Sequence, residues 1–393
     1  MPEIKPEVET FAKIKVVGVG GSGGSAINRM ITVKIKGVEF VAINTDVQAL
    51  LHNNARHKLH IGETTTKGLG AGMDPNIGLQ AAQESVEEIR DELKGSDMVF
   101  ITCGLGGGTG SGASPVVAQV AKELGALVIA IVTKPFAFEG AQRMEIAERS
   151  HKELEARVDT IITIPNDKIF QIIDKKTSLL DAFKIVDDVL RQGIQGISEA
   201  ITIPGLINVD FADVKTIMNN AGSALMGIGE ATGENRAVAA AKKAISSPLL
   251  DISIDGARGV LLIFTGSSNL TMNEVNEAAK VITEGADSNA KIIFGTVIDD
   301  NMKDKVRVTV IATGFDERRP MIIRTMSLEE SKYSMNRLFS KKNIEDKIEE
   351  AKKSVDNQKA DVIKPIMPEK PVKRTVAEED DLEIPAFIRR KMR

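Results

Sequence analysis

The sequence predicts an α/β protein in which a doubly wound parallel-sheet domain is joined by a long central helix to a smaller α/β domain, followed by a flexible C-terminal tail. Three observations predict this class. Strand-like and helical patterns alternate from Lys13 to about Ile203, and an apolar stripe at helical spacing covers residues 178–201. After Phe315 the chain becomes rich in Lys, Glu, Ser and Asn, which is typical of a flexible linker.

After an N-terminal extension of residues 1–11, the first domain covers residues 12–177. Its strand candidates are residues 13–17, 38–43, 98–102, 127–132 and 160–164. Helical patterns separate these strands, and such alternation predicts a parallel sheet with ligands at the carboxyl ends of its strands. The central helix segment follows at residues 178–203.

The second domain is predicted over residues 204–316. Its expected helices lie near residues 211–219, 234–246 and 271–284, and its expected strands near residues 258–265, 290–299 and 305–314. The last two strands are expected to form a hairpin that turns at residues 299–304. Beyond this domain we expect a linker over residues 317–379 and a partner-docking peptide over residues 380–393.

Composition narrows the class of protein. The formal net charge of −4 and the absence of an aromatic and basic stacking surface argue against a nucleic-acid partner. The single cysteine, Cys103, excludes an internal disulfide, fits a reducing cytosol and is expected to be a small packed residue rather than a nucleophile. Residues 1–10 lack a secretory signal, and the longest uncharged run, residues 98–121, breaks as strand, loop and helix. We therefore expect a soluble cytoplasmic protein with no membrane-inserted segment.

Two glycine loops carry the strongest functional signal. Residues 106–112 contain five glycines between a strand and a helical pattern expected from Ser114 to Leu124, and bare N–H groups there would seat a phosphate. Residues 18–23 match G-x-G-x-x-G in a strand–turn–helix context, with the helix expected from Ser25. Alone, that motif with Asp46 after the next strand favours a nicotinamide dinucleotide, and either loop could be a plain tight turn.

Two such loops in one domain favour a polyphosphate that is held from two sides. The motif G-x-x-x-x-G-K-[ST] is absent, so backbone amides and Mg²⁺ would have to meet the phosphate charge. A third flexible loop at residues 68–72 suits a terminal phosphate, although an ordinary surface loop explains it equally well.

Phe183 and Asp187 lie four residues apart on the central helix and therefore share a face. Phe183 could stack on a base, and the Asp187 carboxylate could accept from two adjacent N–H donors, which guanine offers and adenine does not. The alternative places Phe183 in the core and Asp187 in solvent.

Asn208, Asp210 and Asp213 follow the central helix. The default interpretation is that Asp210 or Asp213 caps the next helix. The functional alternative is a pair of carboxylates that orients a water molecule. A helix of about 24 residues is roughly 36 Å long, so these carboxylates could reach only a nucleotide bound to a neighbouring molecule stacked head to tail.

Two further patterns in the chain bear on function. His52, His57 and His60 form H-x₄-H-x₂-H without an evident fourth ligand, so a zinc site is not favoured. The C-terminal run Asp380–Arg390 returns to apolar residues after a polar tether. That return suggests a peptide that becomes ordered on a partner, and a tail without a partner is the alternative.

Together these residues resemble the bacterial tubulin-like division GTPase family FtsZ. Residues 106–112 resemble the phosphate signature of the tubulin superfamily, and the resemblance extends over residues 11–316 and the terminal Ile384-Pro385-Ala386-Phe387 motif. The other matching segments are residues 41–46, 68–72, 134–140, 164–168, 208–213 and 223–229. The resemblance implies a tubulin-like fold. The chain departs from the family at Gly24, Ser25 and Met73, which could alter nucleotide affinity.

The resemblance also implies roles for individual residues. Those implied to bind the phosphates are Gly20, Gly21, Gly108, Thr109 and Gly110, with Ala71 and Gly72 near the γ-phosphate. Glu139, Arg143 and Asn166 would contact the ribose, and Phe183 and Asp187 would hold guanine. The remaining implied nucleotide-binding residues are Ser22, Gly23, Asn44, Asp46, Gly107 and Thr133. Asn208, Asp210 and Asp213 would complete the neighbouring subunit's site, and the docking residues would be Ile384, Pro385, Ala386, Phe387, Ile388 and Arg389.

The function implied by the resemblance is an assembly-dependent GTPase that polymerises head to tail and forms the cytokinetic ring at the mid-cell division site. Its cofactors would be GTP/GDP and Mg²⁺, with K⁺ as a further candidate ion and with no protein ligands assigned to the metal. Its partners would be itself and the membrane-tethering and regulatory division proteins that bind the tail. A nicotinamide oxidoreductase and a GTP-binding scaffold that does not hydrolyse GTP are the alternatives.

Overall fold

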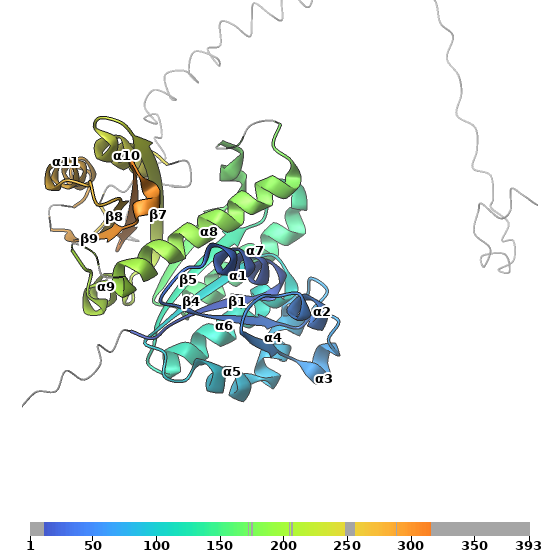
Figure 1. Cartoon of the computed structure of the whole chain (residues 1–393). Helices are drawn as coiled ribbons and strands as arrows, with labels where there is room; N and C mark the ends of the chain where they lie inside the picture. The colour runs from blue at the N-terminus through green and yellow to red at the C-terminus, as the bar shows by residue number, and fades with distance from the viewer. Residues whose placement is uncertain are drawn as a thin grey trace, which may run out of the picture. The chain divides into compact units, whose positions relative to one another are not determined.

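The computed structural model describes residues 12–315 except residues 172, 174–175, 204, 206, 248–255 and 288, and these residues belong to one compact unit (Figure 1). The expected N-terminal extension, the linker and the docking peptide with Ile384, Pro385, Ala386, Phe387, Ile388 and Arg389 lie outside the described residues.

The N-terminal half forms the expected parallel sheet, in the order β3-β2-β1-β4-β5-β6. Its strands are β1 (Ile14–Val19), β2 (Glu39–Asn44), β3 (His57–His60), β4 (Met98–Gly104), β5 (Leu127–Lys134) and β6 (Thr160–Pro165). Five of them were predicted. The sixth, β3, has only four residues of sequence HKLH, and this short edge strand lacks an apolar run that would predict it.

Helices cover both faces of this sheet because successive strand residues point to opposite sides. In β1, Ile14 and Val16 pack into one apolar cluster with α1 (Gly20–Val33) and α8 (Leu179–Thr202). Val17 and Val19 pack into another cluster with α4 (Pro75–Glu84), α5 (Val86–Leu93), α6 (Gly108–Glu123) and α7 (Ala141–Glu155). Figure 1 shows α1 and α8 on one side of β1, β4 and β5, and α4, α5 and α6 on the other. The short helices are α2 (Val47–Leu51), α3 (Glu63–Thr66), η1 (Ala137–Glu139) and η2 (Asn166–Gln171).

The long central helix is confirmed as α8, with 24 residues and hence a length of about 36 Å. The Ser178 hydroxyl caps it by accepting a hydrogen bond from the backbone N–H of Asp181 at 3.1 Å. Its apolar stripe, including Val189 and Ile194, lies in the cluster that also contains residues of the C-terminal strands. The helix therefore connects the two halves through a shared core.

The C-terminal half contains a mixed four-stranded segment in the order β7-β10-β8-β9. Its elements are α9 (Phe211–Met218), β7 (Gly222–Thr232), α10 (Arg236–Ile245), β8 (Gly259–Gly266), α11 (Met272–Thr283), β9 (Lys291–Ile298), η3 (Asp300–Met302) and β10 (Lys305–Thr313). The start of β7 pairs in parallel with β6, so the described strands form one ten-stranded sheet. Strand β7 was not predicted, because its three glycines weaken a strand pattern.

The predicted hairpin between the last two strands is wrong. β9 pairs in parallel with β8, whereas β10 lies between β7 and β8 and is antiparallel to both. From its second residue β10 is almost continuously buried, as expected of an interior strand, while β9 keeps exposed residues at the sheet edge. The intervening segment, residues 299–304, carries the chain past β8 instead of folding it back.

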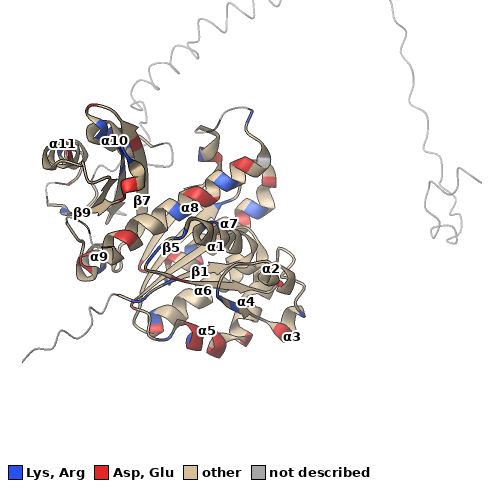
Figure 2. Ribbon diagram, viewed as in Figure 1, with Lys and Arg blue, Asp and Glu red and all other residues tan. Residues whose placement is uncertain are grey.

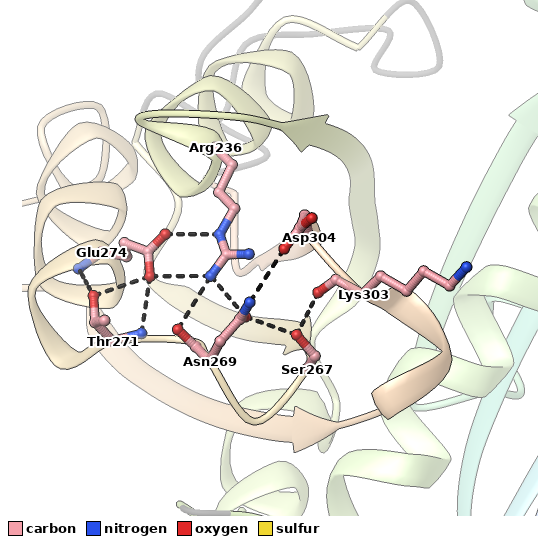
Figure 3. Close-up of polar contacts among 7 residues, drawn as sticks. All are labelled: Arg236, Ser267, Asn269, Thr271, Glu274, Lys303 and Asp304. Carbon is pink, nitrogen blue, oxygen red and sulfur yellow. Dashed lines mark hydrogen bonds and ion pairs between the residues drawn. The ribbon is translucent and has the colours of Figure 1, made fainter.

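A polar cluster around the buried Arg236 side chain ties the C-terminal elements together (Figure 3). The Arg236 side chain, 9% exposed, donates from Nε to Glu274 Oε1 at 2.8 Å and from Nη2 to Asn269 Oδ1 at 2.9 Å. Glu274 also completes a capping box with Thr271 at the start of α11. Because the Ser267 hydroxyl reaches the backbone oxygen of Lys303, the cluster links α10, α11 and the turn before β10.

Candidate nucleotide-binding site

A cavity of about 590 Å³ lies at the carboxyl ends of β1, β2, β4 and β5. All but two of the eighteen residues predicted to bind nucleotide line it. Those lining it are Gly21, Ser22, Asn44, Asp46, Ala71, Gly72, Gly107, Gly108, Thr109, Gly110, Thr133, Glu139, Arg143, Asn166, Phe183 and Asp187. The structure thus brings the three glycine loops, the acidic position after β2 and the central helix to one cavity.

The two exceptions, Gly20 and Gly23, lie behind the lining and allow close backbone packing. A Cβ on Gly20 would lie 2.9 Å from the backbone nitrogen of Gly110, and Gly20 has a φ of +75°. A Cβ on Gly23 would overlap the carbonyl oxygen of Thr102. These positions need glycine so that the first loop can pack against the second loop and against β4.

Both glycine loops are shorter than predicted, because helices begin inside them. Helix α1 begins at Gly20 instead of near Ser25, and α6 begins at Gly108 instead of near Ser114. The first-turn N–H groups of a helix have no partner within that helix and attract anions, and neither first turn carries an acidic residue. Two helix N-termini therefore meet at the cavity, an arrangement suited to a polyphosphate.

Hydroxyl groups fix the loops around these termini. Ser22 Oγ accepts from the Gly104 N–H at 2.7 Å, which joins the first loop to the end of β4. The hydroxyls of Thr45 and Thr109 lie 2.7 Å apart, which joins the strand β2 loop to α6. Ser111 Oγ accepts from the Gly106 N–H at 2.9 Å inside the second loop. The phosphate-facing backbone is thus held in place without a lysine.

Two glycines of the second loop are expected to respond differently to alanine. In Gly112→Ala the Cβ would overlap the backbone oxygen of Pro75 where α6 packs on α4, so we expect a loss of unfolding free energy of about 3 kcal/mol. In Gly107→Ala the Cβ has no heavy atom within 4 Å, and φ is −93°, so the fold should tolerate it. Because Gly107 lines the cavity, that variant should instead bind GDP about tenfold more weakly.

Denaturant unfolding and GDP titration of both variants measure these effects. A Gly107→Ala protein that unfolds as easily as Gly112→Ala, or binds GDP as tightly as wild type, would contradict this assignment.

The base-binding end of the cavity is formed by one face of α8. Phe183 is 40% exposed, and its ring packs edge-on against the buried ring of Phe136 at a centroid distance of 5.5 Å. Burial raises the pKa of Asp187 to about 6; Arg29 lowers it and Asp188 raises it further. Phe183 is thus neither a core residue nor free in solvent, and Asp187 is a half-buried carboxylate suited to hydrogen bonding with a base.

Two residues of this face were not predicted to bind nucleotide. Val186 and Leu190 also line the cavity, although the apolar stripe of the central helix contained both. Their spacing from Phe183, three and seven residues, places all three on one helix face and was the available signal.

Another part of the cavity wall carries the predicted ribose-binding residues. Glu139 forms an ion pair with Arg143 and accepts from the Phe136 N–H at 2.9 Å. Arg143 Nε also approaches Met73 Sδ at 3.4 Å, so the unusual Met73 contacts this wall. Asn166 is 6% exposed, and its Oδ1 atom is buried without a hydrogen-bond partner among the described residues. An unpaired buried acceptor in a cavity wall is expected where a ligand donates a hydrogen bond.

The three residues of the distal loop do not line this cavity. Asn208, Asp210 and Asp213 are exposed at the other end of α8. Asp210 occupies the N-cap position of α9, but its side chain forms no capping hydrogen bond. The simple capping interpretation therefore does not account for its carboxylate.

The weaker candidates contribute no second site. Cys103 is buried, and its burial raises the pKa of the thiol to about 11, so it is a packed residue. Within the part of the chain that the structure describes, no group of three His, Cys, Asp or Glu side chains could hold a metal ion, and His57 pairs with Glu92 at 3.2 Å. None of the described helices is long and apolar enough to cross a membrane.

Two family models match the chain. The GTPase domain of the tubulin/FtsZ family matches residues 13–174, and the C-terminal domain of the FtsZ family matches residues 222–316. The first match contains the Gly18–Gly23 motif, which decides against the nicotinamide oxidoreductase and, by its GTPase description, against a scaffold without hydrolysis.

Solved structures agree. An FtsZ dimer from M. jannaschii is 49% identical, with a TM-score of 0.76, over 78% of this chain and 89% of that one. Two proteins of Haloferax volcanii share the fold. GDP-bound monomeric CetZ1 is 23% identical, with a TM-score of 0.69, over 78% of this chain and 95% of that one. CetZ2 in a GTPγS-bound protofilament is 18% identical, with a TM-score of 0.67, over 84% of this chain and 100% of that one. The family models and the 49% identity show that the chain belongs to the FtsZ family of tubulin-like GTPases.

Proposed function

We propose that this GTPase assembles head to tail into protofilaments and hydrolyses GTP at a site shared between consecutive subunits. A single observation carries the proposal: the residues of the nucleotide cavity and the carboxylates of Asp210 and Asp213 lie at different ends of α8. The cavity lies beside the first half of α8, whereas Asp210 and Asp213 are exposed beyond its other end, and their side chains form no hydrogen bond with a described residue. The relative from M. jannaschii was solved as a dimer, which fits self-association.

In the proposed mechanism, the cavity residues bind and orient GTP. The N-termini of α1 and α6 would receive the phosphates, Asn166 Oδ1 would accept from a ribose hydroxyl, and Asp187 would accept from guanine. Fixed amide dipoles aimed at the phosphates stabilise charge that develops in the transition state. The neighbour's Asp210 and Asp213 would then polarise the attacking water, with Asn208 beside them.

We also propose Mg²⁺ as cofactor, with K⁺ as a further candidate ion. The cavity lining fits Mg²⁺ held by phosphate oxygens and water, because its polar groups are backbone amides and hydroxyls and it contains no cluster of ligating side chains among the described residues. When bound, Mg²⁺ neutralises phosphate charge that the chain's own amides only partly meet.

The test is GTP turnover per molecule as a function of protein concentration, with light scattering recorded in parallel. A shared site requires turnover per molecule to rise above the concentration at which scattering rises. Turnover that is independent of concentration would mean a self-contained site and would overturn the proposal.

We further propose that the filaments form the cytokinetic ring of bacterial cell division at mid-cell in the cytoplasm. Residues 384–389 would dock membrane-tethering and regulatory division proteins. The return of apolar residues after the polar linker supports this docking role. Deletion of residues 380–393 should leave GTP turnover unchanged and abolish binding to such partners. Binding that survives the deletion would refute the docking assignment.

A further inference from the structure

A second cavity, of about 660 Å³, lies between the GTPase half and the C-terminal half and shares no lining residue with the nucleotide cavity. Its walls come from α1, α8, β7, α10 and β10. Neighbouring faces of α8 serve the two cavities, since Asp187 lines the first and Asp188 lines the second. Figure 2 shows basic and acidic positions following one another along this helix.

Positive charge predominates in the second cavity. Among the described residues that line it, the basic side chains are Arg29, Lys184, Arg191, Lys243 and Arg307, and the acidic ones are Asp188 and Glu230. These described lining residues therefore carry an excess of three positive charges, and such an excess in a concave site attracts anions.

Both carboxylates already have their own partners. Asp188 accepts from Arg191 Nε at 2.7 Å and from Gln192 Nε2 at 2.6 Å. Glu230 accepts from Arg307 Nε at 2.7 Å and from Lys305 Nζ at 3.0 Å. These bonds occupy the two carboxylates, so the other cations of the cavity receive no direct hydrogen bond from them.

Among the described residues, Arg29 and Lys243 lack a carboxylate within hydrogen-bonding distance. Arg29 Nε is buried without a hydrogen bond and forms only a long ion pair with Asp188 Oδ1, at 3.9 Å. Lys243 Nζ donates only to the backbone oxygen of Glu230, at 2.9 Å. Lys184, another basic residue of the lining, is paired with Asp181 at 2.9 Å. The Arg29 side chain as a whole is 41% exposed, so its guanidinium is accessible to an acceptor from outside the chain, and its buried Nε atom has none among the described residues.

We propose that this cavity binds a small molecule that carries a phosphate group on an apolar body. A phosphate monoester carries between about 1.5 and 2 negative charges at neutral pH, which suits two cations that lack a direct hydrogen bond to a carboxylate. A guanidinium such as that of Arg29 can grip it with two parallel hydrogen bonds, and an ammonium adds a point charge. Ile185, Val189 and Ile228 supply an apolar wall for the rest of the ligand.

Arg29 and Lys243 come from different halves of the molecule, so a ligand bound by both would affect stability. Arg29 belongs to α1, which begins at the first phosphate loop, and Lys243 belongs to α10 in the C-terminal half. A ligand held by both would bridge the two halves of the molecule, so its binding is expected to raise the unfolding midpoint by mass action.

The test uses phenyl phosphate as the probe and phenol as its uncharged counterpart, with the full-length chain saturated with GDP so that the nucleotide cavity is filled. Binding is measured by calorimetry and by the unfolding midpoint. Phenyl phosphate should bind and raise the midpoint, and phenol should do neither. Lys243→Gln should weaken phenyl phosphate binding about tenfold, the equivalent of one lost charged hydrogen bond, and Arg29→Gln should do the same.

Lys242→Gln is the matched control, because Lys242 is exposed on the same helix but does not line the cavity. This variant should bind phenyl phosphate as wild type does. Equal binding by all three variants, no binding to wild type, or equal binding of phenol would each overturn the proposal. The GDP affinity of Lys243→Gln is measured separately to check that its nucleotide cavity is intact. Because no outcome depends on GTP turnover, the test is independent of the proposed shared hydrolysis site.

Discussion

Replacing Asp213 with alanine is expected to lower GTP turnover at least about a hundredfold while GTP binding stays unchanged, because the carboxylate acts on a water molecule outside its own subunit's cavity. The structure gives this residue no other task, since the side chain is exposed in the first turn of α9 and pairs with no described residue. Its removal should therefore leave the unfolding free energy within about 0.5 kcal/mol of wild type.

Asp91→Ala is the matched control, because Asp91 is an exposed acid on α5, away from both groups of polar residues. Turnover and nucleotide affinity of this variant should equal those of wild type. Turnover of Asp213→Ala within threefold of wild type would refute the proposed role.

A mixing experiment separates a shared site from an indirect effect. Asp213→Ala keeps its cavity, and Asp187→Ala keeps its distal carboxylates. In an equal mixture, about a quarter of head-to-tail contacts combine an intact cavity with an intact distal loop, so turnover should reappear although neither variant is active alone. If scattering shows that the two variants co-assemble and turnover stays absent, the site is not shared.

How much of this could be predicted from the sequence is clearest at the glycine loops. Residues 18–23 and 106–112 were identified, but the helices that begin inside them were not. Helix propensity places glycine near the bottom of the scale, so a pattern reading begins each helix after the last glycine. The actual starting points depend on close packing of Gly20 on Gly110, a contact between two distant segments that propensity does not contain.

The order of the C-terminal strands could not be predicted from the sequence for a similar reason. Two apolar strands around residues 299–304 are typical of a hairpin, and only the competition for neighbours decides otherwise. β10 gains two partners by lying between β7 and β8, and β7 itself was hidden by its glycines. One of these, Gly229, lets the backbone of α10 approach, since a Cβ there would overlap the carbonyl oxygen of Ala240.

The second large effect is expected at Asp187. Asp187→Ala should weaken GTP binding about a thousandfold, because guanine's N1–H and amino donors would lose a half-buried acceptor. Asp187→Asn should change the preferred base instead. Its amide offers one acceptor and one donor, which match the N1–H and the O2 carbonyl of xanthine, so the XTP to GTP affinity ratio should rise. Competition binding with GTP, XTP and ATP measures both effects; an unchanged ratio would remove Asp187 from base recognition.

The pH dependence follows from the same carboxylate. Only ionised Asp187 accepts both guanine donors, and burial raises its pKa to about 6, so GDP affinity should fall as the pH falls through 6. The stability of the nucleotide-free protein should show the opposite trend at this residue. Its folded-state pKa lies above the usual value of 3.8, so the stabilisation from its proton is complete below pH 3.8 and is lost as the pH rises to 6.

Above pH 6 the nucleotide-free protein therefore carries the cost of an ionised, half-buried carboxylate. After allowance for its partial exposure, this cost is about 1–2 kcal/mol. Asp187→Asn should accordingly unfold at higher denaturant concentration than wild type at pH 7.5 and at the same concentration near pH 4, while binding GTP less well at pH 7.5. A variant less stable than wild type at pH 7.5 would mean that Asp187 is a structural residue. The expected combination, higher stability with weaker GTP binding, is the mark of a carboxylate kept for its ligand.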